Sequence, residues 1–427
     1  MSHHTQRRAI AAGVAVILAV APTTLLAAGF YVQQQSVTGL GRAYAGETSQ
    51  AADASTIYFN PAGMTRLRSG ELQAGLHVLA PKASVEQDPE GQIPGRDANN
   101  PYGPSPVPNL YWAEPYSERV WVGFGLGAPF GLKNEYDDDF FARYDSLESD
   151  LKVLNLQPSI AVELTDRISV GGGIDLQYAD ATLRSAIPDP VDPLNPATDG
   201  EFDLQGDSWG AGFNLGVLVD LSEQTRLGMH YRSRVTHRLR GTATTTFPEN
   251  AGEREIFGDT FVESGQAELR LPDIASIGIS HRFDHRLTAM VRYSWFNWSR
   301  FDAIEIDLAN SDLTLDQNYR NSHTIALGAE YRLDPFWTVR SGVQYDRTPT
   351  QTDGRSTRTP DGDRTWFAFG ASYATGERWA FDLGYAYVNV SRESLDITRE
   401  FNGQEVTMQG TSEGRVHILS AAMRYHF

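Results

Sequence analysis

The sequence predicts an all-β protein, an antiparallel barrel of about fourteen strands that spans a membrane. Three observations lead to this prediction. Large apolar residues alternate with small or polar ones in many segments, short and long connections alternate between those segments, and the chain ends in an aromatic strand at Phe427. Alternation with a period of two is typical of a strand with one apolar face. Such strands can meet lipid on one side and a lumen on the other.

Residues 1–27 have the pattern of a secretory signal peptide. Arg7 and Arg8 precede an apolar run from Ala9 to Val20, which Pro22 interrupts before a small-residue exit. A retained anchor is the alternative, but the run is shorter than the ~20 apolar residues of a spanning helix. Cleavage removes two arginines and no acid, so the formal net charge of −18 falls by two to −20.

The composition excludes several classes of function. Nucleic-acid binding needs clustered lysine and arginine, which this acidic chain lacks. The chain has no cysteine, so a disulfide framework and a cysteine lipid anchor are excluded. No local motif joins its His, Ser and Asp residues into a catalytic constellation or a metal-ligand set, so we expect no enzyme, no metal site and no cofactor.

The clearest alternation is in the last strand, where Leu419, Met423 and Tyr425 share one face and Ser420 and Arg424 the other. A soluble β-sandwich would show similar alternation, but it would not need an apolar aromatic stripe on so many strands. The expected strands are residues 68–86, 106–116, 119–130, 151–164, 168–185, 207–221, 226–242, 266–282, 287–302, 318–333, 337–347, 364–374, 379–390 and 411–427.

The connections between these strands form two groups. Short polar turns, such as Ser117-Glu118 and Asp334-Pro335, are expected at the periplasmic side, and long connections are expected outside the cell. The long connections are rich in Asp, Pro and Gly and comprise residues 87–105, 131–150, 186–206, 243–264, 303–317, 348–363 and 392–410.

Residues 28–67 lack the strand pattern and precede the barrel domain expected at residues 68–427. They are rich in Gly, Ala, Ser and Gln, yet they include Phe30, Tyr44 and Tyr58. Free tails usually lack such apolar mass, whereas a barrel of this strand number has a lumen wider than its own side chains fill. We therefore expect a compact hatch inside the lumen rather than a disordered tail.

Several motifs resemble those of a known family. Ala28-Gly29-Phe30, the run SVTGLGRAYAGE at residues 36–47 and Asn60-Pro61-Ala62-Gly63 resemble the hatch of the FadL family of outer-membrane transporters. Trp298-Ser299-Arg300-Phe301 and Pro360-Asp361-Gly362-Asp363-Arg364 are similar to later landmarks of that family. The resemblance spans essentially the whole mature chain. It implies a fourteen-stranded barrel whose third strand bends inward, so that the ligand leaves sideways through a gap in the wall.

The third strand has a composition that suits such a gap. Gly123, Gly125 and Gly127 leave one face without side chains, and Pro129 removes a ladder donor just beyond them. A strand of this kind can bulge at low cost. The glycines could equally make room for the hatch, and the two interpretations are compatible.

Ligand capture is assigned partly through the resemblance. In the family, the loop after the third strand forms an outer groove, which gives this role to Phe140, Phe141 and Tyr144. The acidic residues Asp137 to Asp139 of the same loop are expected to be solvated or to bridge lipopolysaccharide through divalent cations. The complete set of candidate ligand-binding residues is Phe30, Phe140, Phe141, Tyr144, Arg184 and Arg320.

A carboxylate ligand would need a cationic partner, and Arg184 and Arg320 are the candidates. The chain is less basic here than the resemblance leads us to expect, because Leu315 stands where a lysine is expected. This departure leaves room for neutral alkanes or aromatics as ligands.

The hatch contains the candidate gating residues. Asn60, Pro61, Ala62 and Gly63 are expected to set a turn that shapes it. Arg42 and Glu47 could pair within the hatch or against the wall and act as a latch, or they could be two unrelated solvated charges.

The function that follows is uptake of long-chain fatty acids or similar hydrophobic compounds across the Gram-negative outer membrane. The resemblance implies capture at a loop groove, a pocket in the lumen and release at the third strand. An importer of neutral hydrocarbons is the main alternative, and a general porin or an outer-membrane hydrolase is weaker. The expected partners are hydrophobic small molecules, outer-membrane lipid with lipopolysaccharide, and the barrel-assembly machinery through the C-terminal strand. We expect a monomer that binds no nucleic acid.

Overall fold

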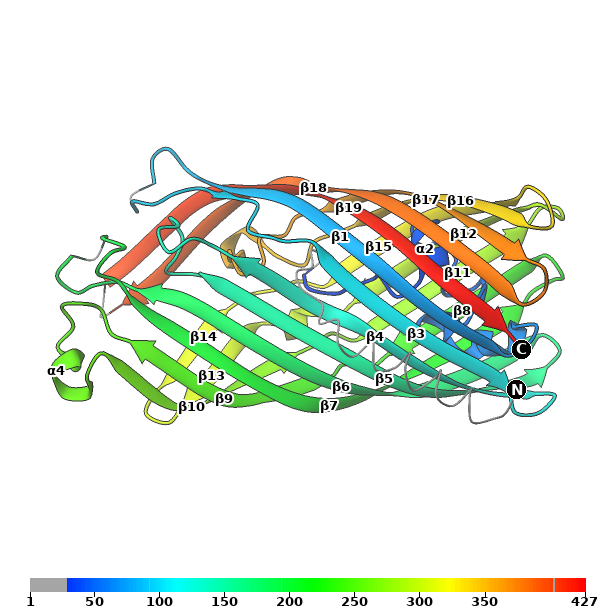
Figure 1. The fold of residues 1–427 in the computed structure, drawn as a ribbon, viewed down its shortest axis with the longest axis horizontal. Coiled ribbons are helices and arrows are strands. Elements are labelled where there is room, and N and C mark those ends of the chain that lie inside the picture. The colour runs from blue at the N-terminus through cyan, green and yellow to red at the C-terminus, as the bar shows by residue number, and fades with distance from the viewer. Residues whose placement is uncertain (1–28, 92, 193, 402–403) are drawn as a thin grey trace.

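The computed structural model describes residues 29–427 apart from residues 92, 193, 402 and 403. The expected signal peptide at residues 1–27 lies outside the described residues. The described chain forms a closed antiparallel barrel of fourteen strands (Figure 1). The barrel closes where the last strand pairs with the first, from Glu71 opposite His426 to Gln87 opposite Gly410.

Ten of the fourteen strands are single elements. They are β1 (Glu71–Gln87), β3 (Ser105–Pro115), β4 (Val120–Glu135), β5 (Glu148–Thr165), β6 (Ile168–Ile187), β7 (Gly200–Asp220), β16 (Trp337–Asp346), β17 (Arg364–Thr375), β18 (Trp379–Phe401) and β19 (Gln404–His426). A short segment, β2 (Ala98–Asn99), adds to the outer end of β1.

The other four strands are each interrupted. They are β8 (Thr225–Arg232) with β9 (Thr236–Thr246), β10 (Thr260–Arg270) with β11 (Ile274–Arg282), β12 (Leu287–Phe296) with β13 (Ala303–Leu308), and β14 (Asp312–Asp316) with β15 (Ser322–Arg332). Asp273 helps to hold the interruptions together, because it accepts hydrogen bonds from the Tyr231 hydroxyl at 2.7 Å and the Asn297 amide at 3.1 Å.

The prediction of a loop is wrong for two segments, which form strands instead. Residues 303–317 are mostly strand, because β13 pairs with β14 and with β10 in the wall. Residues 392–410 are strand as well, because β18 and β19 continue in register to Phe401 opposite Gln404. Their polar composition suggested loops, but these strand ends rise beyond the apolar band, where both faces meet water or other loops.

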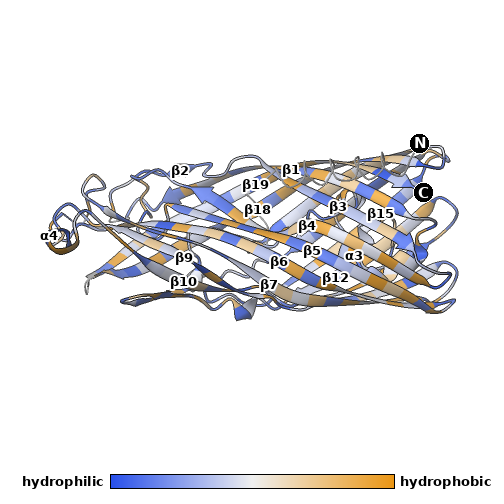
Figure 2. Ribbon diagram, turned by 60° about the horizontal axis from the view of Figure 1, so that its bottom comes forward, coloured by the Kyte–Doolittle hydropathy of each residue, from blue (hydrophilic) through white to orange (hydrophobic). Residues whose placement is uncertain are grey.

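The outer wall carries the apolar face predicted from the alternation. Leu383, Leu419, Phe369 and Ile160 are all more than half exposed. Figure 2 shows orange residues alternating with paler or blue ones along the strands. Such an apolar band is stable in contact with lipid, whereas its exposure to water would be unfavourable. Among the described residues, no helix is long and apolar enough to cross a membrane.

The hatch lies inside the barrel at the end that carries the short turns (Figure 1). It contains α2 (Val37–Leu40), α3 (Thr56–Phe59) and the 3-10 helix η1 (Pro61–Arg66). The remaining short elements are α4 (Glu253–Phe257), η2 (Trp298–Arg300) and η3 (Thr352–Gly354).

Facing glycine pairs in the wall seat the hatch. Gly370 lies opposite Gly384, and a Cβ on Gly370 would lie 2.7 Å from the Cα atom of Gly41 in the hatch. Gly171 lies opposite Gly216, and a side chain on either would overlap the Asn60 to Ala62 turn. The wall therefore admits the hatch backbone only because these positions lack side chains.

Candidate functional site

The third strand, β4, leaves its neighbour β3 halfway along. The two pair only from Pro115 opposite Trp121 to Leu110 opposite Leu126. Beyond that point β3 pairs with β1 as far as Ser105, and β4 pairs with β5 as far as Glu135. No ladder therefore joins residues 105–109 to residues 127–135 in the described structure.

A bulge and the hatch explain this departure. The register of β4 against β5 shifts between Gly127 and Phe130, so β4 contains one extra residue there. The carbonyl of Pro129 accepts a 2.7 Å hydrogen bond from the Val32 amide, and the Gly131 amide donates one of 2.9 Å to the Phe30 carbonyl. The hatch thus satisfies backbone groups of β4 that β3 would otherwise pair.

The glycine face of β4 packs against the hatch. A Cβ on Gly127 would overlap the Gln35 amide, and one on Gly123 would lie 2.6 Å from the Met64 sulfur. Gln35 also donates a 2.8 Å hydrogen bond to the Ala128 carbonyl, at the bulge itself. The glycines therefore make room for the hatch at the place where the strand turns inward, and their part in lateral opening stays a prediction.

An apolar cavity of about 70 Å³ lies in the lumen beside the displaced half of β4. Its walls come from the hatch, from β4 to β6, from β9, β10 and β13, and from the loop after β16. The lining residues are Phe30, Leu132, Ser149, Asp150, Leu151, Ala181, Leu183, Leu239, Ala267, Glu268, Leu269, Phe301, Ile304, Gln317, Arg358 and Thr359.

Phe30 anchors the aromatic floor of this cavity. Its ring centroid lies 4.7 Å from that of Trp298 and 5.1 Å from that of Phe301, and both contacts are edge-on. The preceding amide of Gly29 donates a 2.9 Å hydrogen bond to Asp361 in the loop after β16. The start of the described hatch is therefore held in one position and places Phe30 in the cavity wall.

The only guanidinium that lines this cavity belongs to Arg358. It donates hydrogen bonds to the Ser149 hydroxyl at 3.3 Å and to the Glu148 carbonyl at 3.5 Å, its Nε has no partner, and no carboxylate of the described chain lies within 4.0 Å of it. Burial lowers the pKa of Arg358 to about 10, although the nearby Asp145 raises it. The group remains a cation at neutral pH, and an anionic ligand would offset its desolvation.

Arg184 and Arg320 do not line the cavity. Arg184 is neutralised by Glu201 at 2.6 Å and Glu148 at 3.3 Å. Arg320 donates a hydrogen bond to the Thr348 carbonyl and borders a separate polar pocket. The sequence did not indicate Arg358 as a candidate, because an arginine in a loop rich in Thr and Pro is expected to be exposed to solvent.

Phe140, Phe141 and Tyr144, which the resemblance assigns to an outer groove, do not lie on the surface. All three are buried, in a cluster with Ile397 and Met408 from the raised ends of β18 and β19. The raised strand ends that were expected to be loops provide the apolar cover. These residues form the core of the extracellular cap above the cavity, and a role in capture stays a prediction.

Asp145 ties this cap to the loop after β16. It accepts hydrogen bonds of 2.7 Å from the Ser356 hydroxyl and from the amide and hydroxyl of Thr357, and it pairs with Arg399. Burial would raise the pKa of Asp145, but Arg399 and these donors together lower it. The neighbouring Asp137 and Asp138 are exposed, and Asp139 pairs with Arg96 at 2.9 Å.

Arg42 and Glu47 are a buried pair rather than solvated charges. Their side chains meet at 2.7 Å, and Arg42 also reaches Glu330 of the wall at 3.3 Å. Asn60 caps η1 through the Ala62 amide and donates hydrogen bonds to the carbonyls of Thr48 and Val217. These residues dock the hatch, and whether they gate it stays a prediction.

The closed wall, the apolar outer band, the hatch and the lumen cavity define an outer-membrane β-barrel transport channel. A family model described as Outer membrane protein transport protein (OMPP1/FadL/TodX) matches residues 18–427, and the chain belongs to this family. It is therefore a transporter of hydrophobic compounds in the Gram-negative outer membrane.

Two relatives in sequence cover nearly the whole chain. Outer membrane protein P1 of Haemophilus influenzae is 28% identical and covers 94% of this chain and 95% of its own length. A long-chain fatty acid transport protein of Escherichia coli is 29% identical and covers 97% of each chain.

Solved structures show the same fold. A Pseudomonas aeruginosa FadL homologue aligns with a TM-score of 0.84 at 22% identity and covers 94% of this chain and 100% of its own. The Ralstonia pickettii toluene transporter TbuX aligns with a TM-score of 0.68 at 22% identity and covers 92% and 98%.

Proposed function

We propose that the chain takes up long-chain fatty acids, or amphiphiles with the same apolar chain and anionic head, through the lumen cavity. The observation that supports this proposal is Arg358, a buried cation with no carboxylate within 4.0 Å in the described chain, in a wall made mostly of apolar side chains. The two acidic lining residues, Asp150 and Glu268, are paired with Lys152 and Arg270. An alkyl chain would contact Leu132, Leu151 and Leu239, while its carboxylate would meet the guanidinium. The relative named as a fatty acid transport protein supports the same ligand class.

The ligand would leave sideways between β3 and β4. No ladder joins residues 105–109 of β3 to β4 in the described structure, and Leu132 on the displaced half of β4 lines the cavity. A hydrophobic molecule that moves through this gap would enter the membrane without crossing water, which its apolar surface disfavours.

Neutral aromatic hydrocarbons are the second candidate. The edge-on cluster of Phe30, Trp298 and Phe301 offers a surface that suits aromatic rings, and TbuX is named as a toluene transporter. For such a ligand Arg358 would be a desolvated charge without purpose.

Arg358→Gln separates the two candidates. Because a hydrogen bond to a charged group contributes about 1.5–3 kcal/mol, we expect oleate uptake by cells to fall roughly tenfold or more. Toluene uptake should stay within about twofold. Arg119→Gln, at an exposed periplasmic turn, is the matched control.

Equal oleate uptake by the Arg358→Gln variant and the wild type would contradict carboxylate recognition and favour the neutral hydrocarbon. Loss of both activities in a folded barrel would mean that Arg358 only shapes the cavity wall.

A further inference from the structure

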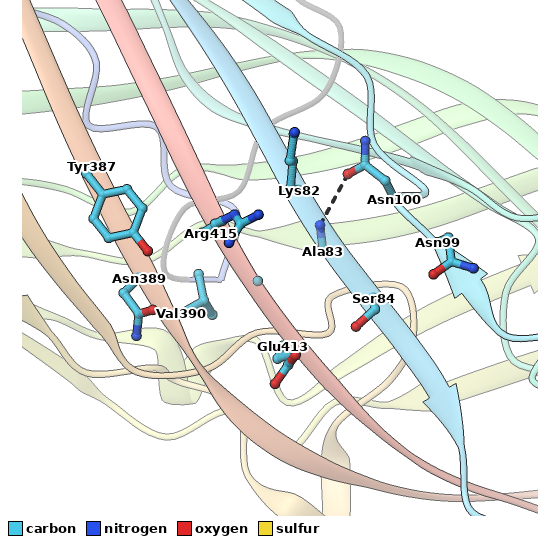
Figure 3. Close-up of a pocket in the computed structure, with 11 residues that line it drawn as sticks. Lys82, Ala83, Ser84, Asn99, Asn100, Tyr387, Asn389, Val390, Glu413 and Arg415 are labelled. Atoms are coloured by element: carbon cyan, nitrogen blue, oxygen red, sulfur yellow. Dashed lines mark hydrogen bonds between the residues drawn. The ribbon is translucent and has the colours of Figure 1, made fainter.

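A second recess lies on the outer surface of the barrel, away from the lumen. It has a volume of about 490 Å³ and lies across β1, β18 and β19. Figure 3 shows Lys82 and Arg415 side by side on β1 and β19, with Asn100 bonded to the backbone of Ala83. Its polar lining includes Lys82, Ser84, Asn99, Asn389 and Arg415, of which Lys82 and Arg415 form a cation pair.

The recess lies next to the edge of the apolar band, toward the end of the barrel that carries the long connections. On β18 the outward residues Trp379, Phe381, Leu383 and Tyr385 are exposed and apolar or aromatic, and Tyr387 ends the series. The span from Trp379 to Tyr387 matches the roughly 9–11 residues with which a strand crosses a membrane. Asn389 is the next outward residue, and Arg415 lies opposite it in register.

The cation pair therefore sits at the level of lipid head groups, on the side of the barrel that carries the long connections. Because the short turns of outer-membrane barrels face the periplasm, this is the extracellular side. The lipid of that leaflet is lipopolysaccharide, whose lipid A carries phosphates on a glucosamine disaccharide above several acyl chains.

The two cations lack a protein counter-charge. Lys82 lies directly opposite Arg415, and like charges in such a pair destabilise a sheet. Within the described chain no carboxylate lies within 4.0 Å of either side chain. Glu413 also lines the recess, but it is paired with Arg392 at 3.9 Å, as Glu86 is at 3.6 Å.

A second pair of outward arginines lies beside acidic residues. On the side of β7, β9 and β10, Arg238 lies 3.8 Å from Glu268, and Arg240 lies opposite Asp207 in register and donates a hydrogen bond to Gln266. Lys82 and Arg415 are thus a like-charge pair at the level of the lipid head groups, beside the apolar band. A phosphate that carries acyl chains would stabilise this pair, because the phosphate would neutralise the charges and the chains would contact the band.

We propose that this recess binds a lipid A phosphate of lipopolysaccharide. The Lys82 ammonium and the Arg415 guanidinium neutralise the phosphate, while Ser84, Asn99 and Asn389 offer hydrogen-bond donors around it. The acyl chains lie along the outward side chains of Leu383 and Leu419 on the apolar band. This site is separate from the lumen cavity and does not depend on which compound is transported.

Native mass spectrometry of the purified full chain, titrated with bisphosphorylated lipid A, tests the proposal. At about 1 kcal/mol for each cation near an anionic lipid surface, the double variant Lys82→Ala, Arg415→Ala should bind lipid A roughly tenfold more weakly or worse. The matched control Arg238→Ala, Arg240→Ala removes two outward arginines, of which one pairs with Glu268 and the other lies opposite Asp207, and it should bind within about twofold of the wild type.

Two further titrations identify the source of the phosphate. Dephosphorylated lipid A should bind the wild type as weakly as bisphosphorylated lipid A binds the double variant, and millimolar inorganic phosphate should displace little lipid. The proposal is overturned if the double variant, shown to be folded by its heat-modifiable gel mobility, binds lipid A like the wild type. It is also overturned if dephosphorylated lipid A binds equally, or if inorganic phosphate abolishes binding as an adventitious anion.

Discussion

The wall between β18 and β19 and the wall between β3 and β4 belong to one sheet but are joined differently. From Trp379 to Phe401, β18 pairs with β19 along its length with a single irregularity, whereas β4 pairs with β3 only as far as Leu126. At the first wall the hatch packs against glycines without bonding to strand edges. At the second, the hatch backbone replaces the neighbouring strand.

The difference shows that the hatch has two tasks. Against β17 and β18 it fills the lumen, and Arg42 of the hatch pairs with Glu330 of β15. Against β4 it occupies hydrogen-bonding groups that would otherwise close the barrel. A change on the first side should loosen the seal, and a change on the second should alter the gap.

Arg42→Ala should break the seal most strongly. It leaves Glu47 buried without its partner and removes one contact of Glu330, and breaking a buried pair costs about 3–5 kcal/mol. We expect a lower unfolding temperature and larger conductance in planar bilayers. Charge reversal at both Arg42 and Glu47 should restore only part of the loss, because a glutamate at position 42 would face Glu330. Wild-type conductance in Arg42→Ala would contradict the latch.

Gly370→Val should have the next largest effect. Its side chain would overlap the Gly41 backbone, and overpacking of this kind costs typically 1–3 kcal/mol. We expect a displaced hatch, measured as faster cleavage of the hatch by an added protease. Ala421→Val adds similar volume on the lipid face and should leave cleavage unchanged, so equal cleavage in both variants would argue against the glycine seat.

Asp145→Asn should have a smaller effect, confined to the cap. The substitution removes the charge that pairs with Arg399, so we expect faster amide hydrogen exchange in residues 131–150 and 348–363, with the barrel unchanged. Unchanged exchange in both segments would show that the cap does not depend on this tie.

Titration of the Asp145 carboxylate should make the stability of the cap depend on pH. The folded-state pKa of Asp145 is lowered, so its contribution is complete above the unfolded pKa of roughly 3.9 and is lost as the pH falls through the folded value. Exchange in the wild-type cap, corrected for the intrinsic rate, should therefore rise only below about pH 4. Asp145→Asn should not show this rise.

The barrel could be predicted from the sequence because lipid on one side and a packed lumen on the other impose a period of two on each strand. The interruptions near Ser233 and Leu271 could not be predicted from the sequence, because the alternation of apolar residues resumes after a gap of only three residues. Burial of Phe140 and the position of Arg358 depend on loops that meet across more than two hundred residues of chain, as Asp145 and Thr357 do. No local sequence pattern indicates contacts between loops so far apart in the chain.

We propose that the extra residue of β4 keeps the wall open for lateral release. Deletion of Ala128 removes the register shift, and Ala128→Gly keeps it as a matched control. If the claim holds, the deletion lets β4 pair with β3, slows amide exchange in residues 105–109 and lowers oleate uptake roughly tenfold or more, while the control transports normally. Slowed exchange together with wild-type uptake in the deletion variant would contradict it.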